Sequence, residues 1–304
     1  TAAIAGFTAA AGASQSVTVT AATPTLSVSL GALTRLGAGL EVAACCAVTA
    51  SQPAPAGGVA VTLTSSDATR LMVAPAAIPA EGGSGVVILV IPAGSASVAF
   101  SLQGRESVTG TATVTATATG HSAGTSPAVS LEAPVMTLVN LSASLASPAP
   151  NDDFGVRLGI AATSGGPTFG AAQALRQGGA GAVTATVTTS NAAAGSLVTA
   201  GGSGASQPVS ILPGQSDSPA TVAAGGVAFD PNNGAGAETT TVAATVPGFG
   251  GTTGATQIVT VTGPSLSVDL GPLPRLGAGL EVSACCVVRS NQPAPGGGLV
   301  VTLT

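Results

Sequence analysis

Short runs of alternating apolar and polar residues recur along the chain. They include "VAVTLT" (59–64), "TATVTATAT" (111–119) and "QIVTVT" (257–262), and "GVVILVI" (85–91) is a continuous apolar run. β-Branched residues with a period of two predict β-strands. Clusters of Pro, Gly, Asn and Ser between the runs predict turns. The segment "GAAQALRQGG" (170–179) is the best helical candidate and predicts one or two turns at most. We therefore expect an all-β chain of two-sheet sandwiches.

The chain repeats itself at two spacings. Residues 24–64 align without gaps to residues 264–304 and are identical at 29 of the 41 positions. A weaker repeat relates "VTLTSSD" from Val61 to "ATVTTSN" from Ala185, and "PAGS" from Pro92 to "PGQS" from Pro213. A period of 240 residues made of two related modules indicates a tandem array.

The repeats also predict module boundaries. Residues 1–23 are interpreted as the last strands of a preceding module, because "IAGFTAAAGASQSVTVT" resembles "VPGFGGTTGATQIVTVT" near residue 260. Residues 24–133 form a first module type and residues 134–263 a second type. Residues 264–304 are the opening strands of a further module of the first type. We expect a segment cut from the middle of a longer array.

Composition narrows the functions that this chain can serve. Charged residues make up 6% of the sequence, there is no Lys, Trp or Tyr, and the formal net charge is -5. The surface must therefore consist of Thr, Ser, Ala and Gly, which tolerate packing against copies of the same chain. The lack of a basic patch argues against nucleic acid as a partner. The longest apolar run, residues 86–91, is too short to insert into a membrane.

Three segments resemble a known family. "GGVAVTLTSSDATRLMVAP" (57–75), "AGSASVAFSLQG" (93–104) and "GTATVTATATG" (110–120) are similar to the bacterial immunoglobulin-like (Big-type) tandem repeat of large extracellular and surface proteins. The resemblance implies tandem immunoglobulin-like β-sandwich modules in a linear array, located outside the cell or at its surface. The second module departs from the family pattern at residues 165–181 and 230–236, where insertions lengthen loops.

The inventory of reactive side chains does not support an enzyme. The single histidine, His121, occupies the position that Phe7 and Phe249 take in the other closing motifs, which indicates a packing or loop role. No serine lies in a strand-to-helix elbow with a histidine partner. The pair Asp152–Asp153 is interpreted as part of a turn rather than as a Ca²⁺ site. We expect no catalytic residue, no bound metal and no cofactor.

The four cysteines form two adjacent pairs in the repeated segment. Strict alternation along a strand places Cys46 and Cys286 in the core as thiols and Cys45 and Cys285 on the outer face of the sheet. The outer thiols are candidates for a contact or disulfide between chains. Free thiols, metal thiolates and a vicinal disulfide within each pair remain open, although a regular strand disfavours the last.

Two charged pairs recur with the cysteines. Arg35 precedes Glu41 by six residues, and Arg275 precedes Glu281 in the second copy. In a chain with so few charges, each pair is a candidate ion pair at a module junction. The alternative is two independently solvated charges.

These observations favour a structural function. The chain is interpreted as a repeat segment of an extracellular bacterial fibre, filament or surface-protein shaft that associates with copies of itself through uncharged surfaces. The alternative is an adhesin or phage-type fibre module that binds a glycan or host protein through the two insertions of the second module. A third reading is a metal- or redox-active filament that uses the Cys-Cys pairs.

Overall fold

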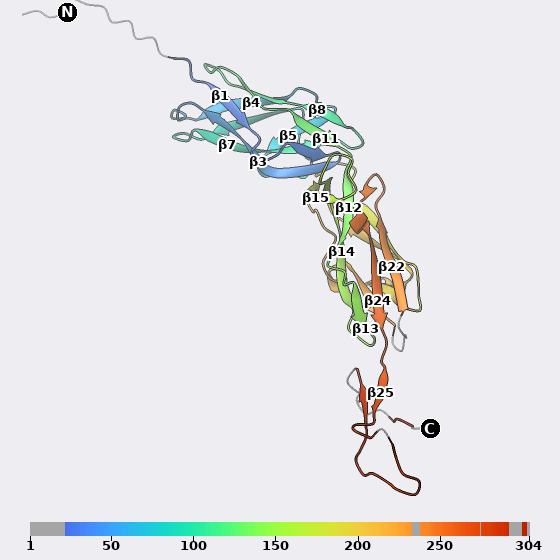
Figure 1. Cartoon of the computed structure of the whole chain (residues 1–304). Coiled ribbons are helices and arrows are strands. Elements are labelled where there is room, and N and C mark those ends of the chain that lie inside the picture. Colours follow the sequence, from blue (N-terminus) through green and yellow to red (C-terminus); the bar gives the residue numbers. More distant parts are fainter. Residues whose placement is uncertain (1–21, 233–237, 274, 292–299, 303–304) are drawn as a thin grey trace, which may run out of the picture.

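The computed structural model describes residues 22–232, 238–273, 275–291 and 300–302. They form two β-sandwiches in series, followed by a β-hairpin (Figure 1). The described residues contain no α-helix and only two short 3₁₀ turns, η1 (Val222–Ala224) and η2 (Thr253–Ala255). The predicted all-β fold is confirmed. The predicted preceding module, residues 1–23, lies almost wholly outside the described residues.

The first sandwich packs two sheets face to face. The first sheet has the order β1-β3-β7-β5, the opposite one β10-β9-β4-β6, and a small third sheet β2-β11-β8 closes the end near the second sandwich. The strands are β1 (Leu26–Ser29), β2 (Arg35–Gly37), β3 (Leu40–Ala50), β4 (Val59–Ser65), β5 (Leu71–Pro75), β6 (Val86–Ile91), β7 (Ser97–Gly104), β8 (Gly110–Ala112), β9 (Val114–Thr117), β10 (Gly124–Thr125) and β11 (Val129–Glu132).

The second sandwich repeats this plan with extra strands. One sheet has the order β19-β18-β21-β14-β12-β23, with β15 beside β14, and the other has the order β13-β24-β22-β17-β20. The strands are β12 (Val135–Val139), β13 (Ser144–Ala146), β14 (Asp152–Ala161), β15 (Phe169–Ala172), β16 (Ala174–Leu175), β17 (Val183–Thr189), β18 (Gly195–Thr199), β19 (Gly202–Gly204), β20 (Ser206–Ile211), β21 (Val227–Pro231), β22 (Glu238–Thr245), β23 (Gly250–Gly251) and β24 (Thr256–Thr262).

Each sandwich has its own hydrophobic core. One core collects buried residues from Leu26 to Leu131, and the other collects residues from Met136 to Val261. The change from one core to the other falls in the link around residue 133. One residue crosses this division: Leu40, at the start of β3 in the first sandwich, is fully buried in the core of the second.

Residues 264–304, expected to open a further module, include the hairpin of β25 (Leu266–Asp269) and β26 (Val287–Ser290). Within the described residues no second sheet covers this hairpin. Leu266 and Val268 are therefore exposed here, whereas Leu26 and Val28 at the same positions of the first copy are buried.

Strand β3 is not regular, and this corrects the predicted alternation. Ala44 adopts a left-handed φ of 48°, and the register against β7 shifts between Val42 and Cys46. The N–H of Ala44 leaves the strand ladder and donates to Ser101 Oγ at 2.8 Å. Two extra residues stand in β3 between Val42, which faces Leu102, and Cys46, which faces Phe100, so the side chains before and after the bulge keep the same alternation. Ala44 is displaced from the ladder and exposed, where alternation with Cys46 would bury it, and Glu41 is buried because Gln177 of the second module covers it.

Candidate functional site: the junction between two modules

The insertion of the second module builds the junction with the first. Strand β16 adds antiparallel to β3, pairing Ala174 with Glu41 and Leu175 with Leu40. The prediction of helical turns in this insertion is wrong, because its residues form β15, which pairs with β14, and β16, which pairs with β3. The N–H of Arg176 donates to Gly39 O at 2.9 Å, and that of Leu175 donates to Gln215 O at 2.8 Å. We call residues 169–178 the clasp segment.

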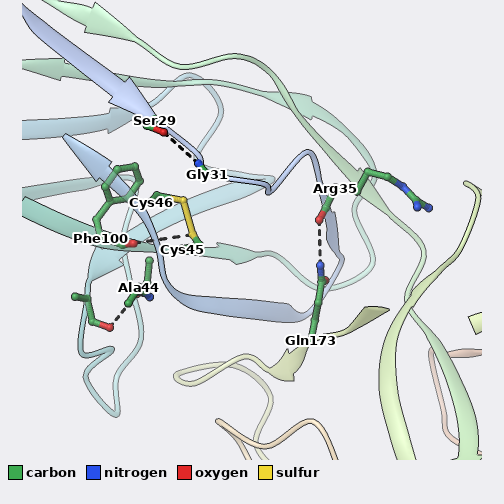
Figure 2. The surroundings of a disulfide bond; sticks show 10 residues. Ser29, Gly31, Arg35, Ala44, Cys45, Cys46, Phe100 and Gln173 are labelled. Carbon is green, nitrogen blue, oxygen red and sulfur yellow. Dashed lines mark hydrogen bonds between the residues drawn. A yellow bond between two sulfur atoms is a disulfide. The ribbon is translucent and has the colours of Figure 1, made fainter. Parts of the chain in front are cut away.

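Gln173 continues the strand pairing with its side chain. Its amide nitrogen donates to the carbonyl oxygen of Arg35 at 3.0 Å, as Figure 2 shows. Its amide oxygen accepts from the N–H of Gly37 at 2.8 Å. Gln173 is buried, so these two bonds satisfy backbone groups of β2 that solvent cannot reach. One side chain of the second module thus acts as a strand partner for the first.

Apolar contact and close backbone approach complete this connection. Leu40 inserts into the second core, and a Cβ on Gly37 would come within 3.3 Å of the Ile160 side chain. Gly178 has a left-handed φ of 67°, and a Cβ there would overlap the carbonyl oxygen of Glu81 in the first module. Glycine is therefore required where the clasp segment crosses the loop of residues 79–83.

Glu41 is held by amides and not by Arg35. Its carboxylate is buried and accepts from Gln103 Nε2 at 2.6 Å, from the N–H of Gln177 at 2.8 Å and from Gln177 Nε2 at 3.1 Å. The candidate ion pair between Arg35 and Glu41 is therefore wrong. The clasp segment covers this carboxylate through Gln177.

Arg35 pairs with Glu132 at the same junction. Arg35 Nε donates to Glu132 Oε1 at 2.8 Å, and Nη2 donates to Oε2 in a second, short contact. Arg35 Nη1 donates to the carbonyl oxygen of Ala162 in the second module at 3.1 Å. The hydrogen bonds from Arg35, with its positive charge, hold the pKa of Glu132 below its ordinary value although burial opposes them. The same bonds raise the pKa of Arg35.

A second ion pair runs from the second module back to the first. Arg176 Nη2 donates to both carboxylate oxygens of Glu106, at 2.7 and 3.0 Å, and Nε donates to Oε1 at 3.0 Å. Burial raises the pKa of Glu106, but the hydrogen bonds and charge of Arg176 outweigh it and leave the pKa below the ordinary value. Since Arg176 is itself buried, this pair is better shielded from water than an exposed surface pair.

The cysteines pair within each Cys-Cys step. Cys45 is bonded to Cys46 (Figure 2), and Cys285 is bonded to Cys286. The expected bridge between chains through Cys45 and Cys285 is therefore wrong in this structure, as is the expectation of free core thiols. The reason is the left-handed residue before each pair, Ala44 or Ala284, which breaks the alternation that would send the two sulfurs to opposite faces.

The two copies differ in the burial of these disulfides. Cys46 is buried in the first core and Cys45 is half-buried, with its sulfur 4.0 Å from the carbonyl oxygen of Phe100. Cys286 is exposed, contrary to the prediction, because no described sheet covers the hairpin.

The other residues and loops that the sequence singled out do not form a second site among the described residues. Arg275 and Glu281 are exposed, and no clasp segment lies beside them in the described residues. The insertion at 165–181 would be a recognition loop if the chain were an adhesin or phage-type fibre module. In the structure, part of it pairs with the first module at the junction. Of the other insertion, Asp230 lies in β21, and residues 233–237 lie outside the described residues. His121 lies in a turn, with Nδ1 3.1 Å from Thr119 O.

No chemistry beyond assembly is visible at this site. In the part of the chain that the structure describes, no three His, Cys, Asp or Glu side chains converge as metal ligands. No described helix is long and apolar enough to cross a membrane. What the junction offers is a buried, hydrogen-bonded connection between two otherwise separate cores.

Sequence reasoning missed most of the residues that form this connection. They are Gln103, Glu106, Glu132, Gln173, Arg176 and Gln177. One signal was available: the insertion contains three long polar side chains within five residues, in a chain built mainly of short ones. Their partners could not be read from sequence, because they lie between 70 and 138 residues away.

Comparison with known proteins gives structural neighbours but no family. No family profile and no curated protein matches this chain. Among solved structures, domains 4–9 of the surface layer protein SbsC align over 80% of this chain and 32% of theirs, with 14% identity and a TM-score of 0.24. The Yersinia pseudotuberculosis adhesin InvE aligns over 79% of this chain and 58% of its own, with 18% identity and a TM-score of 0.21.

A third neighbour is the C-terminal domain of the Streptococcus agalactiae AgI/II polypeptide BspA. It aligns over 78% of this chain and 97% of its own, with 11% identity and a TM-score of 0.23. The first of these three neighbours is named as a surface layer protein and the second as an adhesin.

Proposed function

We propose that this chain is a structural segment of an extracellular surface shaft in which sandwiches are locked together in pairs. The observation that supports the proposal is the addition of β16 to β3, with Leu40 inserted in the opposite direction into the second core. Each module thus donates one element to its neighbour. Bending at this junction would break strand hydrogen bonds and expose a buried leucine, so the pair resists it.

The lock is specific to one kind of junction. In the first module the connection between β3 and β4 is the short turn at residues 51–58, and it contains no counterpart of β15 or β16. A module of the first type therefore has no clasp segment to place on a module before it. Arg35 and Glu41 recur as Arg275 and Glu281. Each first-type module would therefore have the same acceptor edge, which is the edge of β2 and β3 that binds the clasp segment. The proposed shaft alternates clasped and unclasped junctions.

Distances between spin labels on the two sandwiches of the full chain test the lock. The labels are attached to cysteines placed at the exposed positions Thr117 and Thr239. The unmodified junction should give one narrow distance distribution, and a Q173A/R176A variant a broad one. Q215A, a change at an exposed glutamine, is the control and should stay narrow. A broad distribution in the unmodified junction would show that the modules are not locked.

The proposed shaft lies outside the cell and associates with copies of itself. The pairing of all four cysteines fits an oxidising exterior, and the uncharged surface fits contact with copies of the same chain. Gold-labelled antibodies against the chain should decorate intact cells of the source organism. Labelling that appears only after the cells are permeabilised would contradict an extracellular shaft.

A further inference from the structure

Strand β6 presents an open edge to the outside of the first sandwich. It is the last strand of the order β10-β9-β4-β6, and within the described residues no strand pairs with its outer side. Ser65 N–H donates to Gly85 O at 2.9 Å, which makes Ser65 and Gly85 a hydrogen-bonded pair. Since such pairs alternate along antiparallel strands, the N–H and C=O groups of Val86, Ile88 and Val90 point away from β4.

The same three residues carry exposed apolar side chains. Val86 is 53% exposed, Ile88 69% and Val90 52%. At the start of the strand, Val86 O accepts a short hydrogen bond from Ser84 Oγ. An edge that combines free backbone groups with β-branched apolar side chains, and has no Lys or Pro, favours the addition of another strand.

The second sandwich closes the equivalent edge. Strand β20 is the last strand of its sheet and has the same pattern of buried and exposed positions as β6. Its outward residues are Ser206, Pro208 and Ser210, and its register places Pro208 where β6 has Ile88. Proline has no N–H to offer a further strand. One chain therefore blocks this edge in one module and leaves it open in the other.

We infer that β6 pairs antiparallel with β6 of a second copy, about a twofold axis at Ile88. This inference rests on the self-association proposed above and names the strand that carries it. Ile88 of one copy faces Ile88 of the other, and Val86 faces Val90. The three exposed residues of this run, Val86, Ile88 and Val90, are β-branched and uncharged, so the twofold pairing is self-complementary. The two four-stranded sheets become one continuous sheet.

The size of this contact predicts its strength. One strand from each copy buries much less than the roughly 1,600 Å² of a standard stable interface. A single pairing is therefore weak and reversible. A longer array with several first-type modules repeats the contact, and its association strengthens through effective concentration.

Sedimentation velocity of the full chain over a range of concentrations tests the pairing. The unmodified chain should dimerise reversibly. I88K puts a charge on the edge, and I88P copies the device of β20; each should raise the dissociation constant at least about tenfold through lost strand hydrogen bonds. The matched control is I258K, at a residue that is 64% exposed on β24, which lies inside its sheet. It should change the constant by less than about twofold, and circular dichroism checks that each variant folds.

The other possible results of the sedimentation experiment would contradict the proposed pairing in different ways. An unmodified chain that stays monomeric at every concentration overturns self-association and the β6 pairing together. Dimers that survive both I88K and I88P overturn only the β6 pairing. An effect of I258K as large as that of I88K would place the contact on the sheet faces. As a second measurement, I88C should form a disulfide dimer under mild oxidation, and I258C should not.

Discussion

The backbone N–H of Gln177 donates a hydrogen bond of 2.8 Å to the carboxylate of Glu41, which lies 136 residues earlier in the other sandwich. Glu41 is buried, and its remaining donors are the side-chain amides of Gln103 and Gln177. A buried carboxylate is tolerated only when donors surround it. Two of these three donors belong to the second sandwich, so folding of the first module's edge depends on the second.

Removal of the Leu40 side chain should destabilise the second module, although Leu40 belongs to the first. We expect L40A to lower the free energy of unfolding of the full chain by about 2 to 5 kcal/mol, the cost of a cavity in a packed core. Hydrogen exchange should quicken in peptides from the second sandwich. The matched control is L280A at the same position of the repeat, where the leucine is 69% exposed, and we expect a change within about 0.5 kcal/mol. Equal effects of the two variants would contradict the insertion.

Removal of the Gln173 side chain should lower the free energy of unfolding more than removal of an exposed glutamine side chain does. Q173A leaves the buried groups Gly37 N–H and Arg35 C=O without their partner, and we expect a loss of about 1 to 3 kcal/mol in urea unfolding. Q215A, an exposed glutamine close to the same junction, should be neutral within error. A neutral Q173A would mean that water replaces the amide at no cost.

The junction should weaken in acid. Both Glu132 and Glu106 have a pKa below the ordinary value of 4.5, so the fold favours their charged forms. Their contribution is complete above the unfolded-state pKa and is lost as the pH falls through the lower folded-state pKa values. Between about pH 5 and pH 3, unfolding free energy should therefore fall more steeply for the unmodified chain than for E132Q.

The control for this pH dependence is Asp217, whose ion pair with Arg157 is about two-fifths exposed on both sides. Such pairs contribute little to stability. D217N should keep the steep acid profile of the unmodified chain. A profile for E132Q that matches the unmodified one would show that Glu132 does not contribute to the acid sensitivity.

All four cysteines should be unreactive until they are reduced. The two vicinal disulfides predict no thiol that reacts with Ellman's reagent under native, non-reducing conditions. On a non-reducing gel the chain should run as a monomer. Reactive thiols, or a dimer that disappears with reductant, would restore the reading in which Cys45 and Cys285 link chains.

The strands of both sandwiches could be predicted because their sequence signal is local. "VAVTLT" and "QIVTVT" became β4 and β24, and the apolar run at 85–91 became β6. The bulge in β3 could not be predicted in this way. It depends on a left-handed alanine, a conformation usually reserved for glycine, and on Ser101 of another strand, which accepts the displaced N–H.

The sequence indicated where the junction lies, but the predicted partners of its charged residues were wrong. The repeat of Arg35 and Glu41 correctly drew attention to this region, yet their partners are Glu132 and Gln177, which are distant in sequence. A spacing of six residues describes neighbours on a chain and not neighbours in space. The departure of residues 165–181 from the repeat pattern indicated a special segment, but β-strand addition to a preceding module leaves no local periodicity to read.

The clasp segment belongs to one module type, and its acceptor edge belongs to the other. This arrangement limits how a chain of such modules can gain or lose modules. A gene duplication or deletion of one sandwich would leave either a clasp segment facing a surface that cannot receive it or a buried leucine facing water. Only whole pairs can be gained or lost without such damage. The identity of 29 of 41 positions at a spacing of 240 residues, beside the faint likeness between adjacent modules, is the record that inheritance in pairs would leave.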